Sequence, residues 1–391
     1  MSVCDSILAL NPYQGGKPIS ELQRELGLDH VVKLASNENP LGVGPKALEA
    51  MQQAITEIDR YPDGNGFELK AALSEHFSVS SDRITLGNGS NDILELIARA
   101  YVCAQTDEVV FSQYAFVVYP LVTQALGATA VVTPAKEFGH DLDAMLAAIT
   151  DNTKVVFIAN PNNPTGTLLE DQAIFEFLEQ VPSSVIVVLD QAYVEYLEGE
   201  DLALTWLETF DNLVVTRTFS KAYGLAGLRV GYALSSTQVA DYLNRIRQPF
   251  NVNHVAQSAA VAALNDEAFL ARSIMANQNG LAQLSKGFDR LGLSYIKSSA
   301  NFISVKVSDA GDMYQQLLKK GFIVRPVEMP NYLRVSVGTQ HENEDFLEAL
   351  ESLLWLSDFV LLAWAWLAVH LPKVWKRQVK LKPLSVMVDA K

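Results

Sequence analysis

Cysteine is scarce in this sequence. Among 391 residues there are only two, Cys4 and Cys103, and their spacing fits neither a disulfide framework nor a metal-binding cluster. Positive charge is also scarce. The chain has 30 lysines and arginines but 45 aspartates and glutamates, which gives a formal net charge of −15. Such an acidic surface repels phosphate backbones. We therefore expect neither a metal site nor a nucleic-acid partner.

Signal-peptide features and repeated segments are not found either. Residues 1–5 lack the basic start of a signal peptide and the apolar stretch after them is short, so we expect a cytoplasmic protein. Hydrophobic residues make up 49% of the chain and charged residues 19%, which is typical of a folded globular protein. A chain of 391 residues has room for one large and one smaller domain, each with its own core.

Apolar runs that fit buried strands alternate with helical patterns through the first two-thirds of the chain. Runs of Val, Ile and Leu without polar alternation predict strands covered on both faces, as in a parallel α/β sheet. Helices fit between them, for example at residues 91–103 and 173–179. The predicted strands are 83–86, 108–112, 128–133, 154–159, 185–190, 213–217 and 230–234.

The pattern changes near residue 266. A long helical stretch is followed by short strands predicted at 304–307, 322–324 and 332–337, which favours an α+β domain. Residues before about Ala35 show no regular pattern, so we expect an irregular N-terminal arm. The predicted organisation is an arm at 1–35, a large α/β domain at 36–265, a small α+β domain at 266–352 and a tail at 353–391.

The tail has an unusual composition. Residues 353–371 contain one acidic residue, Asp358, and three tryptophans, and five lysines or arginines follow between 373 and 382. This stretch is long enough to span a bilayer, but its basic end would then lie on the far side from a cytosolic body, against the positive-inside tendency. A helix packed on the protein or lying at a membrane surface is favoured. A segment appended by read-through is a third alternative.

Residues able to do chemistry follow the ends of predicted strands. Lys221 comes four residues after the strand 213–217, and a lysine in such a place is costly unless it is used, for example to form a Schiff base. Taken alone, an exposed loop lysine is the simpler interpretation. Eight residues later, Arg229 could hold a phosphate together with the hydroxyls of Thr218 and Ser220 through charge-assisted hydrogen bonds.

Asp190 ends the run 185–190, with Tyr193 three residues further on. A carboxylate at the carboxyl end of a parallel strand faces the crevice where α/β folds bind ligands. Paired with a pyridine nitrogen, it would keep that nitrogen protonated and make the ring an electron sink. For an isolated aspartate, a helix cap is the simpler interpretation.

Two turns with constrained backbones follow other strands. In residues 160–166, two prolines and a glycine define an extended turn that could aim the amide of Asn163 into the same crevice. Residues 87–91 hold two glycines before a helix, so the free N–H groups near Ser90 and Asn91 could bind a phosphate. A plain turn explains each stretch almost as well by itself, and 87–91 lacks the lysine and spacing of an ATP-binding loop.

Taken together, four strand ends supply a phosphate-binding turn, a donor to a ring hydroxyl, a partner for a ring nitrogen and an imine-forming lysine. This combination resembles the fold type I (aspartate aminotransferase-like) enzymes that use pyridoxal phosphate (PLP), and within them it is most similar to the histidinol-phosphate aminotransferases. The resemblance implies an α/β fold with a large domain built on a mostly parallel mixed sheet and a smaller α+β domain. The stretches that carry it, within roughly 10–354, are 11–17, 34–42, 60–63, 160–166, 190–193, 218–221 with Arg229, and 332–339.

The resemblance implies a cofactor, PLP, and a role for each matching residue. Lys221 would carry the cofactor and later move a proton, and with Asp190 and Tyr193 it forms the implied catalytic set. Asp190 would pair with the ring nitrogen, Asn163 and Tyr193 would bond the ring hydroxyl, and Tyr114 would stack on the ring. The phosphate would be held by Ser90, Asn91, Thr218, Ser220 and Arg229.

Further roles concern the substrate and a partner subunit. The resemblance implies that Tyr61 reaches the cofactor phosphate of a neighbouring subunit, which makes a homodimer part of the prediction. Arg334 is the implied anion-binding arginine for the substrate, and it would accept a carboxylate or a phosphate. Additional substrate contacts are expected from Tyr13, Asn39 and Arg325, although a surface position for Arg325 is an equally good interpretation.

The sequence departs from the family pattern in three places. Gln191 stands where the family usually has Glu, residues 112–114 read Ser-Gln-Tyr in place of Pro-Thr-Tyr, and the tail has no counterpart. The second departure puts the role of Tyr114 in doubt, whereas the first lies beside the site and need not change the chemistry.

The expected activity is transamination of histidinol phosphate with 2-oxoglutarate in histidine biosynthesis. The alternatives are an aminotransferase for aromatic or other amino acids, or a related phospho-amino-acid decarboxylase. A different class of alternative is a non-catalytic binding or regulatory protein tethered by its tail. The presence of Lys221, Asp190, Tyr193 and Arg229 argues against that last alternative, because a protein without catalysis need not keep all four.

Overall fold

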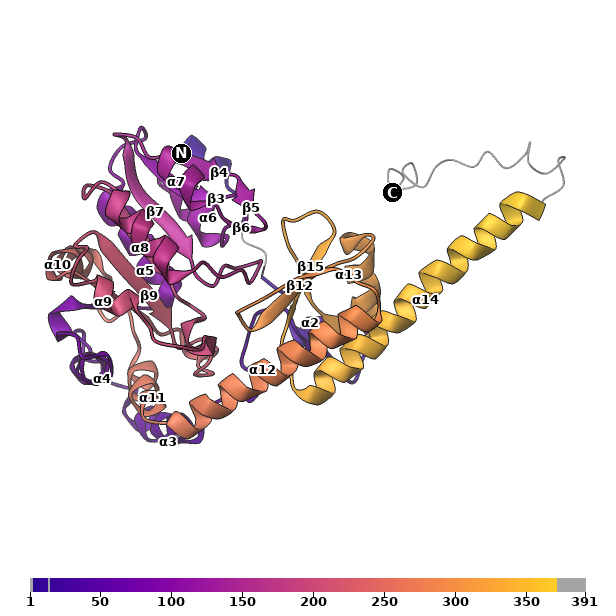
Figure 1. Cartoon of the computed structure of the whole chain (residues 1–391). Coiled ribbons are helices and arrows are strands. Elements are labelled where there is room, and N and C mark those ends of the chain that lie inside the picture. The colour runs from indigo at the N-terminus through magenta and orange to yellow at the C-terminus, as the bar shows by residue number, and fades with distance from the viewer. Residues whose placement is uncertain (1–2, 13–14, 371–391) are drawn as a thin grey trace.

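The computed structural model of the chain describes residues 3–12 and 15–370, with side chains up to Trp355. A seven-stranded sheet forms the centre of its first part (Figure 1). Its strands are parallel except β10, which runs antiparallel to both of its neighbours. The order is β2 (Ile84–Gly87), β10 (Gly231–Ser235), β9 (Leu213–Thr218), β8 (Ile186–Asp190), β7 (Thr153–Ala159), β3 (Glu108–Ser112) and β4 (Thr129–Thr133).

Helices cover both faces of this sheet, because successive residues of its strands belong to two different hydrophobic clusters. In β7, Val155 and Phe157 pack in one cluster while Val156 and Ile158 pack in the other. One face carries α5 (Ser90–Tyr101), α6 (Val118–Ala125) and α10 (Thr237–Ile246). The other carries α3 (Pro45–Ala54), α4 (Phe67–Phe77), α7 (Leu142–Ala147), α8 (Asp171–Gln180), α9 (Ala203–Trp206) and α11 (His254–Leu264). The predicted mostly parallel α/β sheet is therefore confirmed.

A smaller antiparallel sheet follows in the chain. Its order is β11 (Tyr295–Ile296), β12 (Phe302–Lys306), β15 (Tyr332–Ser336) and β14 (Arg325–Pro326). The helices α12 (Glu267–Arg290), α13 (Ala310–Lys319) and α14 (Gln340–His370) share a hydrophobic cluster with it. The domain boundaries expected from the sequence stay predictions.

The expectation of an irregular N-terminal arm is wrong within the described residues. The arm contains α1 (Asp5–Leu8), α2 (Ile19–Leu26) and β1 (Val32–Lys33), and β1 pairs in parallel with β13 (Phe322–Ile323). The strand predicted at 322–324 therefore joins the arm and not the small sheet. The helical pattern of hydrophobic residues in this segment was weak, because α2 buries a single residue, Leu22, which packs against Leu318 and Ile323. Its boundaries were readable, since Pro18 precedes the helix and Gly27 ends it at a φ of 65°.

The start of the tail is helical. α14 packs beside α12 and continues past the body as one helix (Figure 1). It buries Phe346, Leu347, Leu350 and Leu353, whereas Trp355 is 69% exposed. The basic residues after 371 lie outside the described residues. Of the helices that the structure describes, none combines the length and hydropathy needed for a membrane span.

Candidate active site

Four loops meet at one edge of the large sheet. β2, β7, β8 and β9 run in the same direction, so the loops after them share the carboxyl edge. The loop after β7 also touches the small sheet, because Ser304 Oγ donates a hydrogen bond to the Pro164 carbonyl at 2.6 Å. Residues from both sheets therefore line the candidate site, as the rule for α/β folds leads one to expect.

Lys221 follows β9 and points toward Ser36, the first residue after the arm. Its Nζ donates to the Ser36 carbonyl at 3.2 Å and lies 5.8 Å from the centre of the Tyr193 ring. Burial, followed by the positive charge of Arg334, lowers the pKa of Lys221 to about 8. An amine with this pKa is neutral in part at physiological pH, which a nucleophile or a proton acceptor requires.

Asp190 is 4% exposed at the end of β8. Its Oδ2 accepts a hydrogen bond from the Tyr119 hydroxyl at 2.8 Å, and its Oδ1 has no hydrogen-bond partner among the described residues. Burial raises the pKa of this carboxyl. An unsatisfied buried oxygen needs a donor, and a protonated ring nitrogen would supply one. Tyr119, which lies stacked on Phe157 at 4.5 Å, was not found from the sequence.

The hydroxyl of Tyr193 lies between two amides. Asn163 Nδ2 and Asn37 Nδ2 each donate to it at 3.0 Å. Arg334, on β15 of the small sheet, donates from Nη1 to Asn163 Oδ1 at 2.6 Å and from Nη2 to the Ala35 carbonyl at 2.7 Å. The substrate arginine expected from the sequence is thus connected to Tyr193 through one amide.

The turn after β2 forms a concave cradle with Arg229. Gly89 has a φ of 81°, and a Cβ added there would lie 2.4 Å from Arg229 Nη2, so only glycine lets the guanidinium approach this turn. Arg229 Nη1 donates to Ser220 Oγ at 3.1 Å, and Ser90 begins the 12-residue helix α5. A helix N-terminus beside a guanidinium favours an anion. Of the other predicted phosphate contacts, Thr218 Oγ1 accepts from the Ser220 N–H at 3.1 Å and Asn91 is exposed.

The predicted ring-stacking residue and the additional predicted substrate residues have different surroundings. Tyr114 is half-buried and stacks on Phe138 with ring centres 6.1 Å apart. Asn39 Nδ2 donates to the Ala222 carbonyl and to Ser273 Oγ, so its amide connects two protein segments. Arg325 lies directly opposite Arg334 in the β14–β15 pair. Tyr13 lies outside the described residues.

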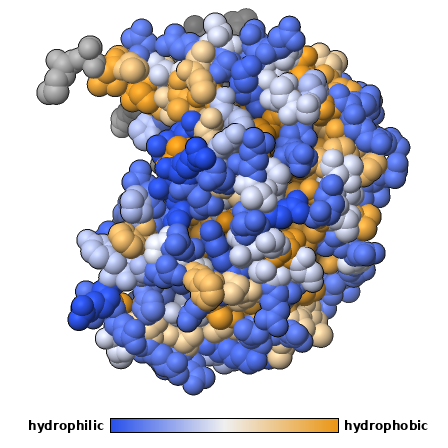
Figure 2. Space-filling view, turned by 90° about the vertical axis from the view of Figure 1, so that its left-hand side faces the viewer, coloured by the Kyte–Doolittle hydropathy of each residue, from blue (hydrophilic) through white to orange (hydrophobic). Residues whose placement is uncertain are grey.

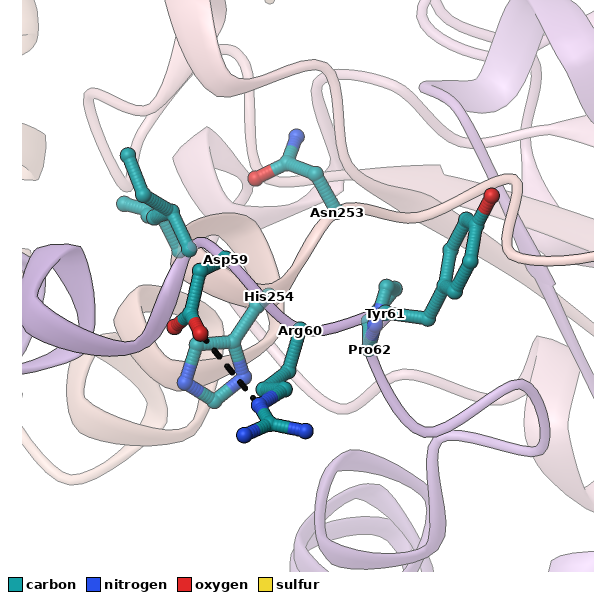
Figure 3. A pocket seen from close by; sticks show the side chains of 8 residues that line it. Asp59, Arg60, Tyr61, Pro62, Asn253 and His254 are labelled. Carbon is teal, nitrogen blue, oxygen red and sulfur yellow. Dashed lines mark ion pairs between the residues drawn. The ribbon is translucent and has the colours of Figure 1, made fainter.

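Tyr61 lies on the surface. It is 83% exposed and stacks on Phe250, with ring centres 4.7 Å apart. It lines a cavity of about 450 Å³ together with residues 58–62 and 253–255. Within it, the Tyr61 ring and the Arg60 side chain point away from each other, and Arg60 pairs with Asp59 at 3.3 Å (Figure 3).

The glutamine that departs from the family pattern belongs to a buried polar cluster. Gln191 Oε1 accepts from Arg217 Nε at 3.1 Å and Nη2 at 2.7 Å. Arg217, on β9, also forms an ion pair with Asp201. The charge of Arg217 is therefore balanced by Asp201, and Gln191 contributes a neutral acceptor. Glu195 lies near the same cluster, and burial raises its pKa to about 7.

Comparisons with known proteins agree with this geometry. The family model described as aminotransferase class I and II matches residues 29–352. The chain is 60% identical over 356 residues to the histidinol-phosphate aminotransferase of Methylobacillus flagellatus, which covers 89% of this chain and 96% of the relative. It is 59% identical over 353 residues to histidinol-phosphate aminotransferase 2 of Pseudomonas fluorescens Pf0-1, covering 88% and 95%. A crystal structure of histidinol-phosphate aminotransferase from Sinorhizobium meliloti in complex with pyridoxal-5′-phosphate has a TM-score of 0.82 at 29% identity, covering 90% of this chain and 98% of that one.

Proposed function

This chain belongs to the class I and II aminotransferases, and we propose that it transaminates histidinol phosphate with 2-oxoglutarate in histidine biosynthesis. It uses PLP as cofactor and acts on small molecules. The observation that carries the choice of substrate is the register of β14 and β15, which sets Arg325 directly opposite Arg334. Like charges in this position repel each other. A phosphate dianion satisfies two guanidinium groups, whereas a carboxylate has charge for one.

The residues present fit PLP. Asp190 Oδ1 lacks a hydrogen-bond partner within the described residues and would accept from the ring nitrogen. The cradle of Gly89, Ser90 and Arg229 would hold the phosphate. When bound, PLP acts as an electron sink for the charge left when a proton leaves the substrate carbon.

The side chains of this chain then have distinct roles. Lys221 Nζ accepts the proton from the carbon that bears the substrate's amino group, because its lowered pKa leaves part of it neutral. Asp190 would hold the ring nitrogen in its protonated form by its charge. Arg334 would bind the substrate anion while its contact with Asn163 keeps it oriented.

The proposal includes a homodimer in which Tyr61 contacts the phosphate of the neighbouring subunit's cofactor. Two observations support it: Tyr61 is exposed, and the loop that carries it is held in place. Arg247 Nη2 donates to the Gly64 carbonyl at 2.8 Å, and Gln257 Nε2 donates to the Asp63 carbonyl at 3.1 Å. An ordered aromatic ring left in water is typical of a surface that binds a partner. A cytoplasmic location stays part of the same proposal.

The substrate is tested by comparing kcat/KM for histidinol phosphate, histidinol and phenylalanine, each with 2-oxoglutarate. We expect a wild-type preference for histidinol phosphate. Arg325→Ala should remove about 1.5–3 kcal/mol of transition-state binding for histidinol phosphate, the usual range for a hydrogen bond to a charged group. The same variant should change the values for histidinol and phenylalanine little, since they lack the phosphate. A wild type that prefers phenylalanine would reject the proposed substrate and leave the aminotransferase family unchanged.

A further inference from the structure

Asn37 is a buried residue that none of the roles above includes. It is 1% exposed and has a φ of 56°, a conformation that asparagine tolerates better than most residues. Its backbone is held from the small-sheet side: its N–H donates to Ser336 Oγ at 2.8 Å, and its carbonyl accepts from Asn301 Nδ2 at 2.9 Å. Its side chain reaches across to Tyr193 in the large sheet's loops. Asn37 therefore connects the two parts of the site.

The contacts of Asn37 define which end of its amide faces Tyr193. Ser336 Oγ accepts from the Asn37 N–H and donates its own proton to Asn37 Oδ1 at 2.9 Å, so Nδ2 points to the tyrosine. Turning the amide round would make Ser336 Oγ accept twice and leave its proton to find another acceptor. Ser336 is 3% exposed, and an unsatisfied buried donor is costly.

The orientation of Asn163 is defined in the same way. Its Oδ1 accepts from Arg334 Nη1, and a guanidinium can only donate, so its Nδ2 must face Tyr193. Arg334 and Ser336 are two residues apart on β15, so their side chains leave the strand on the same face. One strand thus sets both of the amides that bond the Tyr193 hydroxyl.

Because two amides already donate to the Tyr193 hydroxyl, it can form a further hydrogen bond only as a donor. Its oxygen has two lone pairs, and the amides of Asn37 and Asn163 each take one. The hydroxyl proton can then be given only to a third group. We propose that Asn37 is a positioning residue that, with Asn163, makes the Tyr193 hydroxyl a dedicated donor to the ring hydroxyl oxygen of the cofactor. This inference rests on the proposed cofactor.

Asn37→Asp tests this inference, because it keeps the shape of the side chain and replaces the donor by an acceptor. Tyr193 would then donate to the new carboxylate, and the ring oxygen of bound PLP would lose its donor. The extra negative charge on that oxygen should make the neighbouring nitrogen of Lys221, which carries the cofactor, hold its proton more tightly. We expect the pH midpoint of the visible absorbance change of the PLP-loaded protein to rise by about one unit, the size of one hydrogen bond. The dissociation constant for PLP should rise about tenfold.

Two further variants separate this effect from general damage. Asn343→Asp makes the same change at an amide that is 0% exposed and bonds Gln283 and Gly338, so it should lower stability and leave the midpoint unchanged. Tyr193→Phe should raise the midpoint, and adding the uncharged change Asn37→Ala to it should raise it no further, because the hydroxyl that Asn37 positions is then absent. If Asn37→Asp does not fold, Asn37→Ala frees one lone pair of the Tyr193 oxygen without adding an acceptor, and it should raise the midpoint by less than Tyr193→Phe does.

Three results would overturn the inference. They are an unchanged midpoint in the folded Asn37 variant, additive shifts in the double variant, and a wild type that binds no PLP. A wild type that binds PLP and shows the expected shifts, yet does not transaminate histidinol phosphate, would contradict the proposed substrate alone.

Discussion

At the scale of single residues, the chemistry of Lys221 depends on its surroundings. Its pKa of about 8 leaves about a tenth of the amine neutral at pH 7, against about one part in 3,000 for the ordinary value of 10.5. We expect brief acylation of the cofactor-free protein to label Lys221 with a midpoint near pH 8, followed by mass spectrometry of its peptide. Arg334→Gln should move the midpoint upward, because the charge of Arg334 is the second cause of the shift. A midpoint near 10.5 in the wild type would contradict this account.

Residues near strand ends were accessible from the sequence, whereas residues that act from a distance were not. Asp190 ends a buried run, Asn163 and Lys221 follow such runs within four residues, and the structure places all three at one edge of the sheet. Tyr119 contacts Asp190 across 71 positions of the chain, and Asn37 contacts Tyr193 across 156. No local pattern marks such pairs, because the amide or hydroxyl is useful only after the fold has brought it to its partner.

At the scale of elements, β8 and β9 are joined beside the site by the polar cluster of Arg217, Asp201 and Gln191. Arg217 is 3% exposed, so its charge needs a partner, and Asp201 supplies it. We expect Asp201→Asn to lower the free energy of unfolding by about 3 kcal/mol, the lower end of the range for breaking a buried pair, since Asp201 is 30% exposed. Urea denaturation measures this loss.

A compensating change tests whether charge is the cause. Gln191→Glu puts a carboxylate at the position that Arg217 already contacts twice. In the Asp201→Asn background it should restore most of the lost stability, whereas Gln191→Glu alone should add none, because Arg217 is then already paired. A double variant no more stable than Asp201→Asn would show that Asp201 stabilises the loop by other means.

α14 is a second element whose parts differ in importance. Phe346, Leu347 and Leu350 pack in the cluster of the small sheet, and Leu353 completes that contact. Truncation after Leu354 should therefore leave a folded protein that takes up PLP, with a thermal midpoint close to that of the full chain. Truncation after Gly338 removes all four side chains, each worth about 1.5–3 kcal/mol of burial, and should not fold. Loss of the fold in the longer truncation would show that the rest of the helix belongs to the core.

The element predictions were most accurate where the apolar run was continuous. Each strand of the large sheet lies within one residue of its predicted bounds, and this holds for the edge strand β4, where only Thr133 is buried, as well as for the strands covered on both faces. β1 has two residues and β13 has two, and such short pairs carry no periodicity of their own. Their pairing connects the arm to the segment between α13 and β14, and it is a tertiary contact that only the fold reveals.

At the scale of the whole molecule, charge limits how two copies can meet. Each copy has a formal net charge of −15, so copies repel each other unless an apolar contact draws them together. The side of the molecule that carries α4 and α10 shows hydrophobic groups on a mostly hydrophilic surface (Figure 2). Large apolar side chains are exposed along residues 41–67, the segment that contains Tyr61, namely Leu41, Val43, Leu48, Ile55, Ile58 and Phe67, and Phe250, which stacks on Tyr61, is exposed as well. We propose that these side chains supply the apolar contact that such a homodimer would need.

A hybrid dimer distinguishes a Tyr61 that acts on its own subunit from one that acts on its neighbour. Tyr61→Phe removes the hydroxyl and should weaken PLP binding by about 1.5–3 kcal/mol if that hydroxyl contacts the phosphate. One copy would carry Tyr61→Phe and the other Lys221→Ala, with different affinity tags, so that only mixed dimers are purified. The copy that keeps Lys221 then receives an intact Tyr61 only if the tyrosine comes from the partner. We expect its PLP affinity to equal that of the control hybrid of wild type with Lys221→Ala, with about half the turnover of the wild-type dimer. A hybrid with the weakened affinity of the Tyr61→Phe homodimer would show that Tyr61 serves its own subunit, and failure to isolate any mixed or like dimer would reject the homodimer itself.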